Sequence, residues 1–364
     1  MRVYQIVPSL SYGDAIGNEV IALDKVIKEC GYTTIVLSDY VDPRINIKAK
    51  IYNRNKFCSE LFSEDIVIYH KAIGNHFSEE IKEYKCKKIM IYHNMTPKEF
   101  FVPYNKKTAS ALENGIRQLE NLKEYVDYIL ADSEYNKLEL EEIGFKCKID
   151  VQPLIIDFEE YETKPNEDII KRYSDEGTNI IFAGRIAPNK KQEDVIKAFY
   201  YYKNYVDKNA KLFLVGSYNG TEKYYAKLSG FVKQLKLNDV YFTGHIPFED
   251  ILAYYKIADI FLCMSEHEGF CVPLLESMYF GIPIVAFNCS AIPYTLGDSG
   301  VLLDSKNYVE YSEVIRRIMQ DSNYKEDIIA KQRKNLQRFK KSLTVDMFKN
   351  NLNNYIYTIE REKL

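Results

Sequence analysis

Short runs of β-branched and aromatic residues alternate along the chain with longer stretches in which apolar residues recur every three to four positions. The short runs are typical of buried strands and the longer stretches of amphipathic helices, so the alternation predicts parallel sheets covered by helices on both faces. The pattern occurs twice. The expected strands are residues 3–7, 34–37, 66–70, 88–92, 128–131 and 149–152 in the first set, and residues 179–183, 211–215, 240–243, 260–264, 283–286 and 301–303 in the second.

The two sets of strands predict two domains. A stretch rich in Asp, Glu and Lys separates them and is typical of a linker. A chain of 364 residues also exceeds the size of one ordinary hydrophobic core. We therefore expect a doubly wound domain over residues 1–156, a linker over 157–177, a second doubly wound domain over 178–340, and a terminal helix over 341–364, where apolar residues stand at helical spacing.

Composition and charge narrow the classes of function. Hydrophobic residues make up 46% of the chain and charged residues 28%, which indicates a globular protein. The net charge of −3 and the lack of a long Lys or Arg run argue against nucleic acid as a partner. Seven scattered Cys without a C-x-x-C pair, and no leader peptide, favour a reducing cytoplasm. No apolar stretch reaches the roughly 20 residues that cross a bilayer, so any membrane contact is expected to be weak and peripheral.

Glycines and charged residues gather where predicted strands end. In a doubly wound sheet the ligand lies outside the carboxyl ends of the strands, where loops lead into helix N-termini. If these residues were only structural, they would be spread over both ends of the strands. Their bias predicts one cleft between two facing rims, formed by Gly13, Gly17, His93, Gly184, Arg185, Gly216, Gly244 and Glu268.

The segment 268–276 predicts an anion site at a helix start. Pro273 has its φ preset for a first helical turn, so the helix should begin close to it. The amides of residues 269–271 would then point out of the helix start, which suits a phosphate. Glu268 and Glu276 flank that point, and a carboxylate accepts two hydroxyls of a sugar diol. The structural alternative is an ordinary helix whose acidic residues complement its dipole.

A second candidate, the segment 183–190, directly follows a predicted strand. Arg185 offers a planar fork and Lys190 a point charge, which together match the charge of a diphosphate. Gly184 lets the backbone approach a ligand closely. A strand that ends in Gly-Arg by chance is the alternative, and Lys191 is expected to face solvent.

The first predicted helix opens with a glycine turn. Gly13 and its neighbours match neither G-x-G-x-x-G nor the Walker spacing, which argues against a dinucleotide or ATP. The turn is expected to bind the ligand, with a tight turn capped by Asp14 or Asn18 as the alternative.

Two histidines end predicted strands. His93 follows its strand directly and would donate to a charged oxygen or move a proton near neutral pH, although a lone histidine there is often structural. His70 and His76 are expected to be packing or surface residues, and His245 would stand near a base pocket. No Asp-x-Asp and no set of ligands with zinc spacing occurs, so neither a metal nor another cofactor is expected.

Taken together, these motifs resemble the retaining glycosyltransferases of family 4. The resemblance covers about residues 180–305 and rests on Gly184-Arg185 with Lys190, Gly244-His245-Ile246, the run from Glu268 to Glu276, Gly281-Ile282-Pro283 and Gly297-Asp298-Ser299-Gly300. It implies the GT-B architecture, which has two Rossmann-like domains facing across a cleft and a C-terminal helix that packs back on the first domain.

The resemblance also implies roles for individual residues. A nucleotide-diphosphate-sugar donor would be held mainly by the second domain and the acceptor by the first. By this resemblance Arg185 and Lys190 would contact the diphosphate, Glu276 the ribose, and the backbone near Ile246 the base. The donor sugar would be held by Glu268 and by residues Phe270, Cys271 and Val272. In the first domain, Gly13 would contact the donor and His93 would lie close to the reacting carbon.

The implied activity is metal-independent transfer of a hexose or related sugar, with retention of configuration, to a glycan or lipid-linked acceptor. Many relatives build bacterial envelope polysaccharides or glycolipids. The sequence departs from the family pattern at Gly13-Asp14, where many relatives have Gly-Gly, and at Tyr294, where many have Glu. The alternatives are a catalytically silent GT-B subunit that binds a glycan or another transferase, a sugar-nucleotide epimerase or phosphorylase, and, least favoured, a dehydrogenase.

Overall fold

The computed structural model describes residues 1–362, and the chain divides into two compact units. A short segment from the first half of the chain, Glu99–Lys106, belongs to the second unit. Unit 1 comprises Met1–Lys98, Lys107–Ile156 and Phe339–Leu364, and unit 2 comprises Glu99–Lys106 and Asp157–Arg338.

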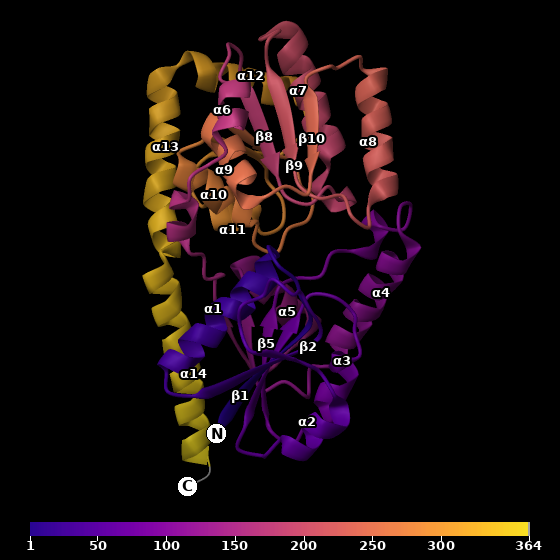
Figure 1. The fold of residues 1–364 in the computed structure, drawn as a ribbon, viewed down its shortest axis with the longest axis vertical. Helices are drawn as coiled ribbons and strands as arrows, with labels where there is room; N and C mark the ends of the chain where they lie inside the picture. Colours follow the sequence, from indigo (N-terminus) through magenta and orange to yellow (C-terminus); the bar gives the residue numbers. More distant parts are fainter. Residues whose placement is uncertain (363–364) are drawn as a thin grey trace. The chain divides into compact units, whose positions relative to one another are not determined.

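Unit 1 is built on a parallel sheet of seven strands in the order β3-β2-β1-β4-β5-β6-β7. The strands are β1 (Arg2–Leu10), β2 (Thr33–Val41), β3 (Ala49–Ile51), β4 (Ile66–Lys71), β5 (Lys87–Tyr92), β6 (Tyr128–Ala131) and β7 (Lys148–Val151). The helices are α1 (Ala15–Glu29), α2 (Arg54–Glu60), α3 (Phe77–Glu80), η1 (Ile81–Glu83), α4 (Lys106–Glu120), α5 (Glu134–Ile143) and α14 (Lys341–Glu362). The short helices η2 (Lys98–Phe100) and η5 (Gln337–Phe339) span positions at which the chain passes from one unit to the other. Figure 1 shows α1 and α14 on one side of this sheet and α3 and α4 on the other.

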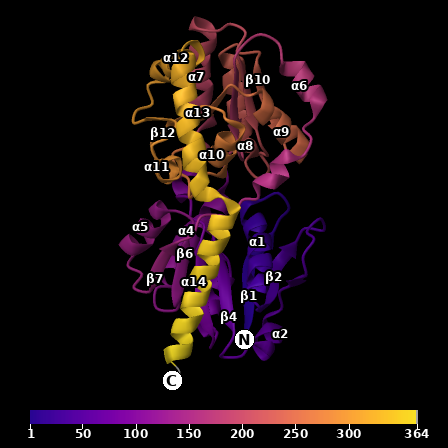
Figure 2. The ribbon, with the colours of Figure 1, turned by 90° about the vertical axis from the view of Figure 1, so that its left-hand side faces the viewer.

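The terminal helix α14 completes the core of unit 1. Phe348 and Leu352 are fully buried and pack with Val3 of β1 and Ile27 of α1 in one hydrophobic cluster. Figure 2 shows α14 running along the sheet beside β4 and β6. The expectation that the last helix packs on the first domain is confirmed, because its apolar stripe has no other surface in this unit on which to be buried.

Unit 2 is built on a parallel sheet of six strands in the order β10-β9-β8-β11-β12-β13. The strands are β8 (Asn179–Ala183), β9 (Lys211–Val215), β10 (Val240–Gly244), β11 (Ile260–Cys263), β12 (Ile284–Phe287) and β13 (Val301–Leu303). The helices are η3 (Phe158–Glu162), α6 (Glu167–Tyr173), η4 (Pro188–Lys190), α7 (Gln192–Tyr205), α8 (Glu222–Gln234), α9 (Phe248–Ile257), α10 (Val272–Phe280), α11 (Ile292–Leu296), α12 (Tyr308–Gln320) and α13 (Ser322–Leu336).

Each sheet has one point at which the strand order reverses. In unit 1 the chain moves outward in one direction through β2 and β3 and then returns to place β4 on the other side of β1. In unit 2 the same reversal places β9 and β11 on opposite sides of β8. Helices diverge at such a switch point and leave a crevice at the carboxyl ends of the two central strands, which is where doubly wound folds bind ligands.

The expected linker, residues 157–177, is a packed part of unit 2. It forms η3 and α6, and the Asn166 amide donates a hydrogen bond to the Asp250 carboxylate at 2.8 Å. The ring of Tyr173 packs edge-on against that of Phe213 of β9, with 4.9 Å between centroids. None of the residues of η3 and α6 is buried, so the segment contacts the rest of unit 2 through individual side chains at the surface.

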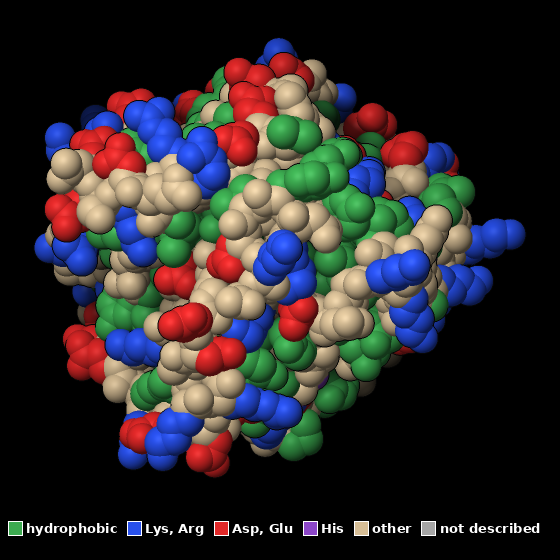
Figure 3. All heavy atoms as spheres, turned by 90° about the horizontal axis from the view of Figure 1, so that it is seen from above, with side chains coloured by type: hydrophobic (Ala, Val, Ile, Leu, Met, Phe, Trp, Pro, Cys, Tyr) green, Lys and Arg blue, Asp and Glu red, His purple; other side chains and the backbone are tan. Residues whose placement is uncertain are grey.

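Two surface properties bear on the partners. No helix within residues 1–362 is both long enough and apolar enough to cross a membrane. On the face drawn in Figure 3, basic and acidic side chains are interspersed over most of the surface. That mixture does not form the continuous basic stripe that a row of phosphates requires.

Candidate functional site

The switch point of unit 2 brings together two segments that are about 80 residues apart in the sequence. Gly184 and Arg185 follow β8, Lys190 ends η4, and the loop after β11 leads through Glu268 into α10. The Lys190 ammonium and the Glu268 carboxylate form an ion pair across this point. The structure therefore places Lys190 beside Glu268, as neighbouring charges of one site.

Gly184 at the end of β8 and Gly216 at the end of β9 allow these two strands to end close together. Gly184 has a φ of +134°, which side chains rarely adopt. A Cβ added to Gly216, at the end of β9, would lie 2.0 Å from the Gly184 carbonyl oxygen. Both positions therefore require glycine for backbone reasons, whether or not a ligand is bound.

The two cations of the site differ in their surroundings. Lys190 is partly buried, and although burial disfavours its charge, the Glu268 carboxylate raises the pKa of Lys190 above its ordinary value. Lys190 is therefore charged at neutral pH. The Arg185 guanidinium is held over the neighbouring loop, where it donates to the Asn219 carbonyl at 3.0 Å.

Helix α10 begins at Val272, close to the position predicted from Pro273. Its N-cap, Cys271, has a left-handed backbone with φ +69°, and no side chain forms a capping hydrogen bond there. The first turn thus directs backbone N–H groups and the positive end of the helix dipole toward the switch point. Phe270 and Cys271 are buried, whereas Val272 and Pro273 in the first turn are half-buried.

The Glu276 carboxylate, one turn inside α10, is held by two tyrosines that the sequence reasoning did not name. Its Oε1 accepts a hydrogen bond from the Tyr161 hydroxyl at 2.7 Å, and its Oε2 accepts one from the Tyr255 hydroxyl. Burial raises the pKa of Glu276, and the two hydroxyls oppose that effect. Two hydroxyls on two carboxylate oxygens is the arrangement that a ribose diol would make.

The remaining candidates of unit 2 lie around the same carboxyl edge. Ile246 is half-buried in the loop between β10 and α9, and His245 beside it is exposed. Tyr294, where many family members have Glu, lies in α11 and is 38% exposed. The solvent-facing role expected for Lys191 differs from the structure, because its ammonium pairs with Glu266 at 3.0 Å.

The switch point of unit 1 contains a buried chain of hydrogen bonds through two histidines. His93 Nδ1 lies 2.8 Å from the Asp132 carboxylate, and His93 Nε2 lies 3.0 Å from His70 Nδ1. His70 Nε2 lies 3.1 Å from Gln5 Oε1, and the Gln5 amide nitrogen donates in turn to the Val20 carbonyl. His70, expected as a packing residue, is therefore buried and bonded to the histidine predicted to be functional.

The chain of hydrogen bonds determines where its protons are. Gln5 Oε1 accepts, so His70 Nε2 carries a proton and donates. A neutral His70 then has a bare Nδ1, which accepts from His93 Nε2–H. Since Asp132 accepts from His93 Nδ1–H, His93 carries both protons and a positive charge. The pKa directions agree: burial holds the pKa of His70 well below its ordinary value, whereas Asp132 raises the pKa of His93 against the effect of burial.

The glycine turn of unit 1 has a largely structural explanation. Gly13 has a φ of +74° with open space around it, and Gly17 has no room for a side chain because an added Cβ would lie 2.4 Å from the Ser11 carbonyl oxygen. Asp14 is the N-cap residue of α1 but makes no side-chain capping bond, and Asn18 donates its backbone N–H to the Asp14 carbonyl at 2.9 Å.

Comparison with known proteins finds a family model that matches part of the chain. Residues 164–335 match the family model Glycosyl transferases group 1. This match lies in unit 2 and includes the Arg185 and Lys190 segment and the whole of α10. The O-antigen chain mannosyltransferase B of Escherichia coli is similar to a part of the chain, with 33% identity over 90 residues, which are 25% of this chain and 24% of that relative. The chain therefore aligns with only about a quarter of that relative's length.

Solved structures match the fold of almost the whole chain. Anabaena HepE, crystallised in complex with UDP and glucose, has a TM-score of 0.78 at 18% identity, with 97% of this chain and 99% of that chain covered. Sucrose-phosphate synthase from Thermosynechococcus elongatus has a TM-score of 0.75 at 15% identity, with 99% and 100% covered. Together the group 1 match and the GT-B fold support a transferase enzyme.

The sequence analysis did not name three residues that bond to the candidate site residues. Asp132 directly follows β6, so the rule about strand ends would have found it. Tyr161 and Tyr255 carry no such signal, since one lies in a segment that looked like a linker and the other in an ordinary amphipathic helix.

Proposed function

We propose that the chain is a glycosyltransferase that moves a hexose or a related sugar from a nucleotide-diphosphate donor to a glycan or lipid-linked acceptor. The observation that supports this most is the ion pair of Lys190 with Glu268 at the switch point of unit 2, where Arg185 follows β8 and α10 begins. Two cations and a helix start match two phosphates, and the carboxylate matches sugar hydroxyls. The mannosyltransferase name of one relative and the UDP and glucose of one structural neighbour support the same substrate class.

The charges of the site suit the departure of a diphosphate. When the bond between the anomeric carbon and the diphosphate breaks, negative charge grows on the leaving group. Lys190 has three N–H donors and gives one to Glu268, which leaves two for phosphate oxygens. Donors that are already oriented stabilise this charge in the transition state more than in the ground state.

We propose that the transfer retains the anomeric configuration and needs no metal ion. The acceptor hydroxyl attacks on the face from which the diphosphate leaves. Its oxygen forms the new bond to the anomeric carbon as the old bond breaks, and its proton passes to a diphosphate oxygen. Arg185, Lys190 and the helix start supply the positive charge that a divalent cation would otherwise provide.

In unit 1 we propose that His93 acts as a fixed cation on the acceptor side. A doubly protonated ring that donates to Asp132 and His70 has no lone pair with which to act as a base. Its contribution would be electrostatic, and the chain Asp132–His93–His70–Gln5 would hold its charge in place.

We also propose a cytoplasmic location, peripheral on the inner face of the cell membrane, and a role in envelope polysaccharide or glycoconjugate synthesis. All seven cysteines are free thiols, which fits a reducing compartment. The O-antigen name of one relative supports the pathway class.

The direct test is a thermal-shift panel of UDP- and GDP-sugars on the full-length chain, followed by a nucleotide-release assay with the sugars that bind. We expect at least one sugar nucleotide to raise the melting temperature and to be turned over. A protein that binds none of them would refute the proposal. Binding to a nucleotide sugar or glycan without turnover under any acceptor would favour the silent subunit.

A further inference from the structure

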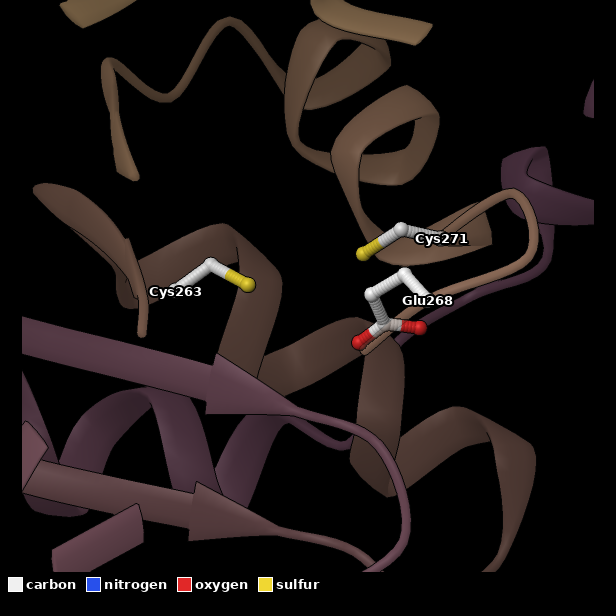
Figure 4. Close-up of side chains that lie close together, drawn as sticks. All are labelled: Cys263, Glu268 and Cys271. Atoms are coloured by element: carbon white, nitrogen blue, oxygen red, sulfur yellow. The ribbon is translucent and has the colours of Figure 1, made fainter. Parts of the chain in front are cut away.

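Two thiols and a carboxylate meet inside unit 2. Cys263 is the last residue of β11, Cys271 is the N-cap of α10, and Glu268 lies on the loop between them. All three are buried, and one ligand atom from each lies within 4.8 Å of the others. Figure 4 shows the two thiols pointing toward one another with the Glu268 carboxylate beside Cys271.

The backbone conformation at Cys271 does not require a cysteine. Cys271 has φ +69° and ψ +67°, a left-handed conformation in which glycine avoids the strain that a Cβ introduces. The Cys271 side chain therefore comes with a strained backbone, and it places a sulfur atom next to the proposed donor site.

The three ligand atoms suit a soft divalent cation. Zinc binds Cys sulfur at about 2.3 Å and carboxylate oxygen at about 2.0–2.2 Å in tetrahedral sites, so its ligand atoms stand roughly 3.3–3.8 Å apart. The ligand atoms here lie within 4.8 Å of one another, which exceeds the upper end of that range by about 1 Å at most. Thiolate ligands select zinc and similar metals over magnesium or calcium.

The net charge of the cluster is the same before and after a metal binds. Lys190 and Glu268 already form a neutral pair. A divalent cation that binds two thiols releases their two protons to solvent and leaves two thiolates, so the net charge of the cluster does not change. Lys190 bonds one oxygen of the Glu268 carboxylate, Oε2, and the metal would take the other.

We propose that Cys263, Glu268 and Cys271 bind one thiophilic divalent cation of the zinc type, and that its binding inhibits transfer. Inhibition would follow because the metal would occupy the Glu268 carboxylate, which is assigned to the donor sugar. Metal binding stands on the geometry alone, whereas the inhibition rests on the proposed function.

Binding is tested with Co²⁺ on full-length protein that has been stripped with a chelator and kept reduced with a phosphine. We expect one equivalent of Co²⁺ to give a thiolate-to-cobalt charge-transfer absorption, and Zn²⁺ to abolish it. Cys271→Gly suits the left-handed backbone and should weaken binding by more than the roughly 10–100-fold typical of losing an outer partner. Cys58→Ser, which changes an exposed thiol in unit 1, is the matched control and should bind normally.

Two results would overturn the metal site: no charge-transfer absorption in the wild type, or equal binding by Cys271→Gly.

The inhibition is tested separately by adding one equivalent of Zn²⁺ to the transfer assay. We expect wild-type turnover to fall at least 10-fold and to return with a chelator, while Cys263→Ser turns over normally and resists zinc. Zinc that binds without slowing transfer would refute the inhibition. If no transfer is found under any condition, the proposed function fails, while the Co²⁺ absorption still decides the metal site.

Discussion

His70 Nδ1 lies 3.0 Å from His93 Nε2, and the two rings are nearly parallel, with 6° between their planes. Through this contact the protonation of one histidine depends on that of the other. His70 must stay neutral so that its Nδ1 accepts, and His93 must stay charged so that it donates in both directions. A residue that was expected to be part of the packing is therefore a hydrogen-bond partner of the residue predicted to be functional.

The first prediction concerns His70 and acid stability. The folded-state pKa of His70 lies well below 6.5 because the ring is buried beside His93. Its contribution to stability is therefore complete above the unfolded pKa of about 6.5 and is lost as the pH falls below that value. His70→Gln keeps an acceptor for His93 but does not titrate. The free energy of unfolding of wild type minus that of His70→Gln should fall by up to about 1.4 kcal/mol per pH unit below pH 6.5.

Urea denaturation of both proteins between pH 5 and pH 8 measures this difference. A constant difference over the whole range would contradict the assignment of a neutral His70.

The second prediction concerns Glu19, whose carboxylate accepts the Ile155 backbone N–H at 2.8 Å. Burial raises the pKa of Glu19 to about 8. The folded state then holds a proton that the unfolded state loses above its pKa of 4.5, so Glu19 becomes destabilising as the pH rises from 4.5 to 8. Glu19→Gln should match wild type near pH 4.5 and be more stable at pH 8, with an upper limit of about 5 kcal/mol.

Denaturant midpoints at the two pH values test this, with Glu120→Gln on the exposed end of α4 as the control that should show no gain. A Glu19→Gln protein with the same advantage at both pH values would rule out titration as the cause.

The third prediction concerns the proposed diphosphate site. Arg185→Ala and Lys190→Ala should each reduce transfer by roughly 100-fold or more, the scale of losing one oriented donor in a transition state. Lys191→Ala is the matched control, since its ammonium pairs with Glu266 and should leave turnover close to wild type. Steady-state kinetics on folded variants measures the effect. Unchanged turnover in both Arg185→Ala and Lys190→Ala would refute the assignment.

The fourth prediction separates ribose binding from stability at Glu276. If donor hydroxyls replace the Tyr161 hydroxyl on Oε1, Tyr161→Phe removes a competitor and should tighten donor binding by about 2–10-fold, the equivalent of one net hydrogen bond. The same variant should lose about 1–3 kcal/mol of stability because a buried oxygen loses its partner. Glu276→Gln should instead weaken donor binding. Calorimetry with the donor found in the thermal-shift panel measures the binding affinity of each variant. Weaker binding by Tyr161→Phe would show that the Tyr161 hydroxyl stays on Glu276 when the donor binds.

The fifth prediction concerns metals. EDTA should leave transfer unchanged, because Arg185, Lys190 and the start of α10 are proposed to neutralise the diphosphate. Protein purified with a thiophilic metal at the Cys263–Glu268–Cys271 site should become more active on the same treatment. A loss of activity in EDTA that Mg²⁺ or Mn²⁺ restores would contradict metal-independent transfer.

Most strands were predictable because each is a short buried run with clear boundaries. The exception is β3, residues Ala49–Ile51, which was not expected. It has three residues at the edge of the sheet, and one of them is the exposed Lys50. A run of that length has too few alternating positions to stand out from a loop, so only its pairing with β2 defines it as a strand.

The local sequence determined the elements. The rule about strand ends found Arg185, Lys190 and Glu268 in unit 2 and His93 in unit 1, and Pro273 marked the start of α10. These properties depend on neighbours within a few residues and on one general feature of parallel sheets. The tertiary structure alone decided the partners: Tyr161 and Tyr255 on Glu276, His70 and Asp132 on His93, and the meeting of Cys263 with Cys271. Those groups come from separate elements, and their distances and charges are set by burial in a common core, which no local pattern encodes.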